Sequence, residues 1–526
     1  MEPRGYLAIV LHAHLPYVRH PEHEDFLEER WLFEAMTECY LPLLDRFRAM
    51  RAEGIAFRIT MSLTPTLASM LRDELLMGRY DRHLGKLQEL ADRERRRAAG
   101  DGKMEALARF YEERLGRERA LWEEVGRDVV GAFADLERTG HVEVLTCGAT
   151  HGFLPLLAQT PTSVRAQVAV GCRTHQRLFG HRPRGIWLPE CAYFPGLDEV
   201  LAEEGLRFFV VDTHGIEHAT PRPLYGVHAP VYTPAGVAAF GRDTESSKQV
   251  WSADEGYPGD FAYRDFYRDI GFDRPLEEIR PYINPDGTRL FTGIKYHRIT
   301  ARTDHKELYD PAVARERAAS HAGHFMWARQ EQVKWLAGGM DRPPIVVAPY
   351  DAELFGHWWF EGPDFLEYLF RKIHYDQEDL RPVTLAEYLQ AHPVNQKSTP
   401  SASTWGAGGY HQVWLEGSNA WMYRHAHHAA REMNGLARDY RDATGALRRA
   451  LEQAGRELLL LESSDWAFIL KTATSTDYAI RRFKAHLARF RRLSAMIRSG
   501  SIDERWLGDL EWRDNIFPDV QYQLWS

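Results

Sequence analysis

Six short apolar runs recur through the first 350 positions, and most end in polar residues or are bounded by glycine or proline. They are YLAIVLH, FRITMSL, VEVLTC, RGIWL, FFVVD and PIVVA. Continuous apolar runs of this length predict strands buried on both faces, as in a parallel sheet. Helical patterns separate several of them, such as the three-to-four-residue spacing of Phe33, Met36, Tyr40, Leu44 and Phe47. This alternation predicts a parallel α/β architecture, either open or closed into a barrel.

Two segments depart from the alternation. Residues 72–135 are highly charged with a helical pattern, which predicts a helical insertion; an extended coiled-coil arm is the alternative. Residues 392–409, HPVNQKSTPSASTWGAGG, predict a linker or long loop. Beyond it, apolar stripes predict a helical bundle, through Leu447, Leu451, Ala454, Leu458 and Leu461, and through Phe483, Leu487, Phe490 and Ile497. The predicted units are therefore 1–395 and 405–526.

Charge and composition exclude several classes of protein. The net charge is −9 and the arginines are interleaved with acidic residues, so the chain has no broad basic face for nucleic acid. The apolar run in MEPRGYLAIVLHAHLPY is too short for a signal peptide or a membrane span, which predicts a cytoplasmic protein without a membrane partner. The cysteines form no C-x-x-C pair and are predicted to be buried reduced thiols: Cys39, Cys147, Cys172 and Cys191.

Two carboxylates follow predicted strands. Glu190 comes directly after RGIWLP, and Asp351 ends PPIVVAPY and opens DAELFGHWWFEGP. In a barrel, reactive groups lie at the carboxyl ends of strands and in the loops after them. An isolated glutamate in a loop is usually only solvated. Two acids in one pocket are typical of a glycosidase, because one protonates the leaving oxygen while the other attacks or stabilises the anomeric carbon. Glu353 is the rival for either role.

Histidines also stand at strand ends. In VLHAHLP, His12 and His14 project to the same side if the strand continues through them. The pair has two interpretations: half of a metal site, or hydrogen-bond donors to sugar hydroxyls and a carboxylate. His151 adds a third imidazole at a later strand end. Because no lysine or further strand-end histidine completes a metal pattern, the sugar-contact interpretation gains support. The 15 Trp, 23 Tyr and 25 Phe fit either core packing or stacking on sugars.

Taken in order, HAHLP, GATHGFLP, IWLPECAY and APYDAELFGHWWFEG resemble the motifs of glycoside hydrolase family 57, and more narrowly those of its branching enzymes. The resemblance continues through SSKQVWSADEGYPGDFAYRDFYRDIGFD, TGIKYHRIT, STWGAGGYHQVWL and ESSDWAFILKTATSTDYAIRRFKAHLARF. It therefore spans nearly the entire chain. It implies an α/β fold with an incomplete (β/α)7 barrel, a helical insertion and a C-terminal α-helical domain.

The resemblance also implies roles for individual residues. The glutamate of W-x-P-E implies Glu190 as nucleophile, and the aspartate of Y-D-x-E implies Asp351 as acid/base. No metal and no cofactor are implied. The implied substrate contacts are His12, His14, His151, Arg268, Gly287, Trp405, Trp414 and Asp465.

Two positions depart from the family pattern. Thr474 stands where branching enzymes can carry glutamine after S-S-D-W. The flexible loop beside the active site carries a tyrosine at its tip in these enzymes, whereas VAAFGRDTESS offers Phe240. A phenylalanine keeps the stacking face but lacks the hydroxyl. We expect this loop to affect the balance between transfer and hydrolysis.

The implied reaction is a retaining double displacement on α-1,4-glucan. Transfer of the cleaved chain to a 6-hydroxyl of an acceptor glucan would form α-1,6 branches, as in a glycogen-type polysaccharide. An α-amylase or a 4-α-glucanotransferase of the same family would use the same catalytic pair. A metal-dependent barrel hydrolase using His12 and His14, or a non-catalytic glycan-binding protein using tryptophans alone, are the remaining alternatives.

Overall fold

The computed structural model describes residues 3–251, 256–300, 303 and 305–526. In this part of the chain the strands form one sheet in the order β6-β7-β5-β4-β3-β2-β1-β8, with β9 paired to β1. All pairings are parallel except that of β6 with β7. The strands are β1 (Gly5–Ala13), β2 (Ile59–Leu63), β3 (Val142–Cys147), β4 (Gly185–Trp187), β5 (Phe208–Val211), β6 (Val231–Tyr232), β7 (Ala238–Gly241), β8 (Ile345–Asp351) and β9 (Leu380–Pro382).

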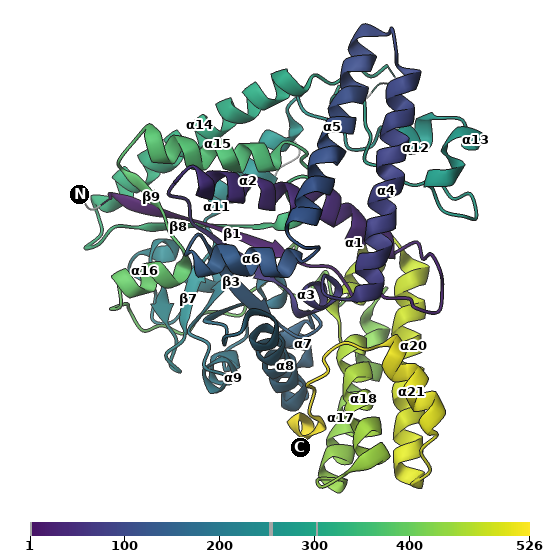
Figure 1. The fold of residues 1–526 in the computed structure, drawn as a ribbon. Coiled ribbons are helices and arrows are strands. Elements are labelled where there is room, and N and C mark those ends of the chain that lie inside the picture. Colours follow the sequence, from purple (N-terminus) through teal and green to yellow (C-terminus); the bar gives the residue numbers. More distant parts are fainter. Residues whose placement is uncertain (1–2, 252–255, 301–302, 304) are drawn as a thin grey trace.

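The parallel strands from β7 through β5, β4, β3, β2 and β1 to β8 curl into an incomplete barrel (Figure 1). The two ends of the curl meet where the amide of Asp243, just after β7, donates to the carbonyl of Val347 in β8 at 2.9 Å. Alternate residues such as Val10, Leu145 and Phe208 fill the interior, as the period of two in a strand requires. The predicted incomplete seven-stranded barrel is confirmed.

The placement of Phe240 at a loop tip is wrong. Phe240 lies inside β7, is 0% exposed and packs in the barrel interior near Phe208 and Tyr388. Ala238 faces the same interior, whereas Ala239 packs on the opposite side of the strand. The run AAFG is too short and too poor in large apolar residues to stand out as a strand in the sequence, and its pairing with β5 is what identifies it.

Helices cover the outside of the barrel (Figure 1). The predicted helix through Phe33 and Phe47 is present, with a π-helical turn η1 (Met36–Tyr40) in its middle. The covering helices are α1 (Glu29–Ala35), α2 (Leu41–Ala52), α3 (Pro65–Met70), α6 (Val129–Arg138), α7 (Leu154–Leu157), α8 (Pro161–Phe179), α9 (Leu197–Glu203), α10 (Thr213–Glu217), α11 (Thr244–Trp251), α14 (Pro311–Ala337), α15 (Gly362–Tyr375) and α16 (Leu385–Ala391). Asp310 caps α14 and Pro311 occupies its first position, as helix starts favour.

The charged region 72–135 forms mainly the helices α4 (Glu74–Arg97) and α5 (Gly102–Glu124), which lie side by side in Figure 1. They do not extend as a free arm. Arg274, beyond α12 (Ile270–Asp273), pairs with Glu94 of α4 at 2.6 Å, and the hydroxyl of Tyr111 in α5 donates to the carbonyl of Lys295 at 2.6 Å. These contacts attach the helical insertion to the segment after α11. That segment also contains α13 (Leu276–Ile279).

The C-terminal region contains α17 (Ala420–Asp439), α18 (Gly445–Leu461), α19 (Ser464–Thr472), α20 (Thr476–Ser499) and α21 (Glu504–Arg513). Figure 1 shows α17, α18, α20 and α21 as neighbouring helices beside the barrel. The predicted stripes on α18 and α20 are largely buried. The segment predicted as a linker or long loop runs along the barrel, where Lys397, Thr399 and Ser403 form β-bridges.

All four cysteines are free and buried, as predicted. Within the described ranges, none of the helices has the length and apolar character needed to cross a membrane.

Candidate functional site

A cavity of about 1330 Å³ lies at the carboxyl ends of the barrel strands and reaches α19. It brings together most of the residues that the sequence nominated, from segments far apart in the chain. Those that line it are His12, His14, His151, Glu190, Asp351, Trp405, Trp414 and Asp465. The volume exceeds the 300–1,000 Å³ of ordinary small-molecule pockets, as a polymer groove would require.

Besides Phe240, three nominated residues do not line this cavity. Arg268 forms an ion pair with Asp273 at 3.1 Å. Gly287 occupies a turn with φ of 90°, where its amide donates to the carbonyl of Asn284. Thr474 is exposed just beyond α19. Arg268 and Thr474 are close in sequence to the cavity residues Tyr267 and Thr472, whereas Gly287 is not close to any.

Glu190 follows β4 in a strained backbone conformation. Its φ of 61° lies in the left-handed region, and the next residue, Cys191, has a φ of 49°. Non-glycine residues adopt this region at a cost, and such strain tends to occur at functional sites. The indole Nε1 of Trp405 donates to Oε2 of Glu190 at 2.8 Å. Burial raises the pKa of Glu190 to about 7, while the hydrogen bond from Trp405 opposes the rise.

Asp351 ends β8 and stands opposite His12 in the sheet register. Burial holds the pKa of Asp351 well above its usual range, and the charges of Glu353 and Glu190 raise it further, against the cation of Arg242. Two buried carboxyls that repel each other do not both ionise easily. The site therefore favours retention of a proton on the Glu190 and Asp351 pair near neutral pH.

Glu353, the rival carboxylate, is held by protein donors. Its Oε1 accepts from the backbone amide of His14 at 3.1 Å and from the hydroxyl of Tyr40. Tyr40 ends the π-helical turn, a feature frequent at functional sites. Burial raises the pKa of Glu353, and these contacts oppose the rise. They hold Glu353 beside Asp351, where its charge raises the pKa of Asp351.

The imidazoles of His12 and His151 form a buried chain. Nδ1 of His12 is hydrogen-bonded to the hydroxyl of Ser62 at 2.9 Å, and its Nε2 to Nε2 of His151 at 3.0 Å. Nδ1 of His151 lies 2.9 Å from the hydroxyl of Ser464 in α19. Burial lowers the pKa of both imidazoles well below the usual value, so both are neutral near pH 7.

His14 differs from His12 and His151 in the direction of its pKa shift. Its Nδ1 lies 3.1 Å from the hydroxyl of Thr64 and its Nε2 lies 3.0 Å from Oδ1 of Asp465. Burial opposes a charge, but the Asp465 carboxylate outweighs it and raises the pKa of His14. Every ring nitrogen of His12, His14 and His151 thus has a protein partner. This arrangement disfavours the metal-ligand interpretation of the H-x-H pair, because metal binding would displace these bonds.

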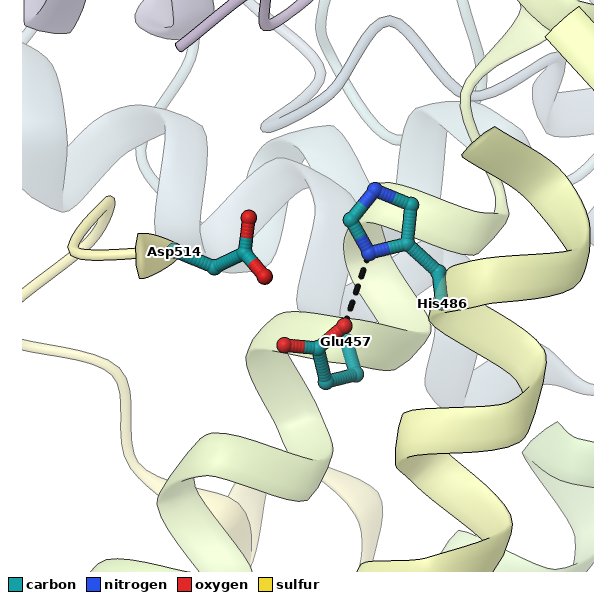
Figure 2. Close-up of side chains that lie close together, drawn as sticks. All are labelled: Glu457, His486 and Asp514. Carbon is teal, nitrogen blue, oxygen red and sulfur yellow. Dashed lines mark hydrogen bonds and ion pairs between the residues drawn. The ribbon is translucent and has the colours of Figure 1, made fainter. Parts of the chain in front are cut away.

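In the described part of the chain, the one group with metal-like spacing lies elsewhere, between α18, α20 and the end of α21 (Figure 2). It comprises Glu457, His486 and Asp514, and Nδ1 of His486 lies 2.7 Å from Oε2 of Glu457. Arg489 donates to Asp514 at 2.6 Å. Burial raises the pKa of Glu457, and the charges of Arg489 and Arg482 oppose that rise. The two guanidiniums offset the charges of the two carboxyls, while Nε2 of His486 and Oδ1 of Asp514 are buried without a hydrogen-bond partner.

The aromatic residues that line the cavity differ in how far their rings are exposed. Trp405 lies edge-on to Trp251, with ring centroids 6.1 Å apart. Trp414 is only 1% exposed, and its ring stacks on Phe153 with centroids 4.5 Å apart. Its ring faces are therefore not free to stack on a sugar. Trp358 is exposed and lines the cavity, whereas its neighbour Trp359 is buried in the core.

Arg242 is a cavity residue that the sequence interpretation missed. It follows β7 directly, its guanidinium lies over the Trp405 ring at 5.8 Å, and its charge lowers the pKa of Asp351. The strand-end rule that selected Glu190 would have selected Arg242 as well, had AAFG been recognised as a strand. Tyr40 carries no such signal, because it lies within a helix.

Two family models match the chain: "Glycosyl hydrolase family 57" over residues 8–400, and "1,4-alpha-glucan branching enzyme, C-terminal" over residues 425–525. A 1,4-alpha-glucan branching enzyme of Thermococcus kodakarensis is 34% identical over 98% of this chain and 78% of its own length. A probable 1,4-alpha-glucan branching enzyme of Mycobacterium tuberculosis is 32% identical over 92% of this chain and 90% of its own.

Solved structures agree in fold over almost the whole length. The alpha-amylase AmyC from Thermotoga maritima superposes with a TM-score of 0.93 at 45% identity, covering 99% of both chains. A branching enzyme of family 57 from Thermococcus kodakaraensis superposes with a TM-score of 0.89 at 33% identity, covering 99% of this chain and 96% of that chain.

Proposed function

The chain belongs to glycosyl hydrolase family 57, and from this membership we propose that it is a 1,4-α-glucan branching enzyme in which Glu190 and Asp351 perform the reaction. The observation that carries the proposal is one large cavity that presents both carboxyls, each with a raised pKa. The matched C-terminal model and the branching enzymes similar over nearly the full length support the same activity.

In the first step, Glu190 attacks C1 of a glucose unit in an α-1,4-glucan. Asp351 donates its proton to the departing glycosidic oxygen, so the C1–O bond breaks as the bond from C1 to the Glu190 oxygen forms. The products are a covalent β-glucosyl enzyme and a shortened glucan with a free 4-hydroxyl. The elevated pKa of Asp351 suits a residue that must begin this step protonated.

In the second step, Asp351 acts as the base. It takes the proton of a 6-hydroxyl on an acceptor glucan, whose oxygen attacks C1 and releases Glu190. Two inversions at C1 restore the α configuration, and an α-1,6 branch results. If water takes the acceptor's place, the outcome is hydrolysis. The donor and the acceptor are both α-1,4-glucans.

The three histidines line the cavity at the proposed cleavage point. His12 and His151 are neutral and linked to each other, so the chain from Ser62 to Ser464 keeps the two imidazoles in fixed orientations. His14 and Asp465 join the barrel to α19 at the cavity wall. We assign Asp465 to substrate positioning by way of His14.

A second candidate is α-amylase, because a solved structure 45% identical over 99% of this chain is named as one. Both activities share the first step. They differ in whether an acceptor glucan or water occupies the cavity when Asp351 acts as base.

The decisive experiment is incubation with amylose, followed by debranching and chain-length analysis. We expect new α-1,6 linkages in excess of reducing ends released. Glu190→Gln and Asp351→Asn should each lower turnover by ~10³-fold or more with the fold intact. Reducing ends without α-1,6 linkages would favour amylase. Substantial turnover in both variants would contradict the catalytic assignment.

A further inference from the structure

A second groove, of about 540 Å³, lies on the outer side of the barrel between α14 and α11. Two tryptophans of α14 line it, Trp327 and Trp335, which are 57% and 81% exposed. They are eight residues apart, about 12 Å along the helix axis. Single apolar side chains are common on protein surfaces, whereas a cluster of them usually marks a binding site. Two exposed indoles in one groove therefore indicate a binding surface.

The rest of the lining is mixed, with polar residues beside the apolar Val227, Ala328 and Leu336. Glu217 of α10 and Glu245 of α11 contribute carboxylates. Gln332 of α14 donates from Nε2 to Oδ2 of Asp243 at 2.8 Å, and its Oε1 is buried without a hydrogen-bond partner. The groove therefore combines flat apolar faces with hydrogen-bond acceptors.

Electrostatics narrows the class of ligand. Arg329 is a cation beside these acids, but it is 0% exposed and lies 3.0 Å from Glu245, so its charge is not presented to the groove. Exposed carboxylates repel phosphates and other anions. A groove with acceptors among its aromatic rings also suits a lipid or an apolar helix poorly. Such a groove matches a neutral polyol whose C–H faces stack on indoles and whose hydroxyls donate to carboxylates and amides.

The groove is joined to the catalytic cavity by α11. The start of this helix, at Thr244 and Glu245, lines the groove, and its last residue, Trp251, lines the cavity. The helix is eight residues long, so the two sites are about 12 Å apart along it. A single polymer chain can therefore span both.

We propose that this groove is a second α-glucan-binding site, in which Trp327 and Trp335 hold a remote part of a polymer whose other part occupies the cavity. The ligand class rests on the proposed function, whereas the exposure of two indoles in one groove does not. The groove adds to the effective concentration of long chains at the cavity and contributes nothing to short substrates.

The test is electrophoresis of the full chain through native gels that contain glycogen, with Kd taken from the retardation. Trp335→Ala and Trp327→Ala should each raise Kd by about three- to tenfold. Trp335→Phe, which keeps a stacking ring, should retain most of the affinity. The control is Trp512→Ala, since Trp512 is 54% exposed but lies in α21. Turnover of a short chromogenic maltooligosaccharide should be unchanged in all of them.

An unchanged Kd in both alanine variants would overturn the site, as would equal losses in Trp335→Phe and Trp335→Ala. A shift in oligomeric state of Trp335→Ala on size exclusion would assign the groove to self-association instead. Linkage analysis is run on the same samples. If the wild type forms no α-1,6 linkages while retardation still depends on Trp335, the proposed branching activity fails and the groove stands.

Discussion

The indole Nε1 of Trp405 lies 2.8 Å from Oε2 of Glu190, and the backbone amide of Trp405 donates to the carbonyl of Glu190 at 3.1 Å. The segment that leads from the barrel to the C-terminal helices thus holds both the backbone and the side chain of the proposed nucleophile. A donor to the ionised carboxylate stabilises it against burial.

Trp405→Phe removes this donor and keeps an aromatic ring. The pKa of Glu190 should then rise above about 7, because burial is less opposed. We expect the acid limb of the kcat/KM profile to move up by about one pH unit. Trp358→Phe, at an exposed position of the same cavity, is the matched control. An acid limb that does not move would show that the bond leaves the proton affinity of Glu190 unchanged.

Glu353→Gln keeps an oxygen to accept from His14 and Tyr40 but removes a negative charge beside Asp351. The pKa of Asp351 should fall, since the charge of Glu353 raises it. The alkaline limb of kcat/KM, where the acid loses its proton, should therefore move to lower pH. Glu34→Gln, also in the cavity wall, should leave this limb in place. Equal shifts in both variants would argue against a specific effect of Glu353.

Asp465→Asn removes the ion pair with His14. The pKa of Asp465 is lowered in the fold, so its contribution to stability is present above the unfolded pKa of about 4 and is lost as the pH falls. The pKa of His14 is raised, so its contribution is present below about 6.5 and is lost as the pH rises through the raised value. The difference in free energy of unfolding between the wild type and the variant should be largest between about pH 4 and pH 6.5, at about 1–3 kcal/mol. Melting temperatures of both proteins across pH 4–9 measure this, and a constant difference would contradict it.

Phe240→Tyr would place a hydroxyl in the barrel interior, where Phe240 is fully buried. We expect destabilisation of about 1–3 kcal/mol from an unpaired polar group. The ratio of α-1,6 linkages to reducing ends should be unchanged, because the side chain does not line the cavity. Urea unfolding and linkage analysis measure the two effects. A changed ratio at unchanged stability would return Phe240 to a role in acceptor choice.

Several features of this protein could be predicted from the sequence alone. Buried parallel strands consist of apolar runs, and reactive groups in a barrel follow them, so Glu190 and Asp351 could be selected as candidates from local pattern. Helical periodicity likewise predicted the stripes on α18 and α20. These features depend on residues close together in the chain, which is why local sequence contains them.

The tertiary structure decided the rest. His14 and Asp465 are separated by 451 positions, and Trp405 lies 215 positions after Glu190, so no local pattern pairs them. The assignment of Arg242 to the cavity and of Phe240 to the core required the register of β7 against β5, since one residue of slip exchanges the two faces of a strand. Proton affinities depend on burial and on charges brought together through space, and the fold alone supplies these.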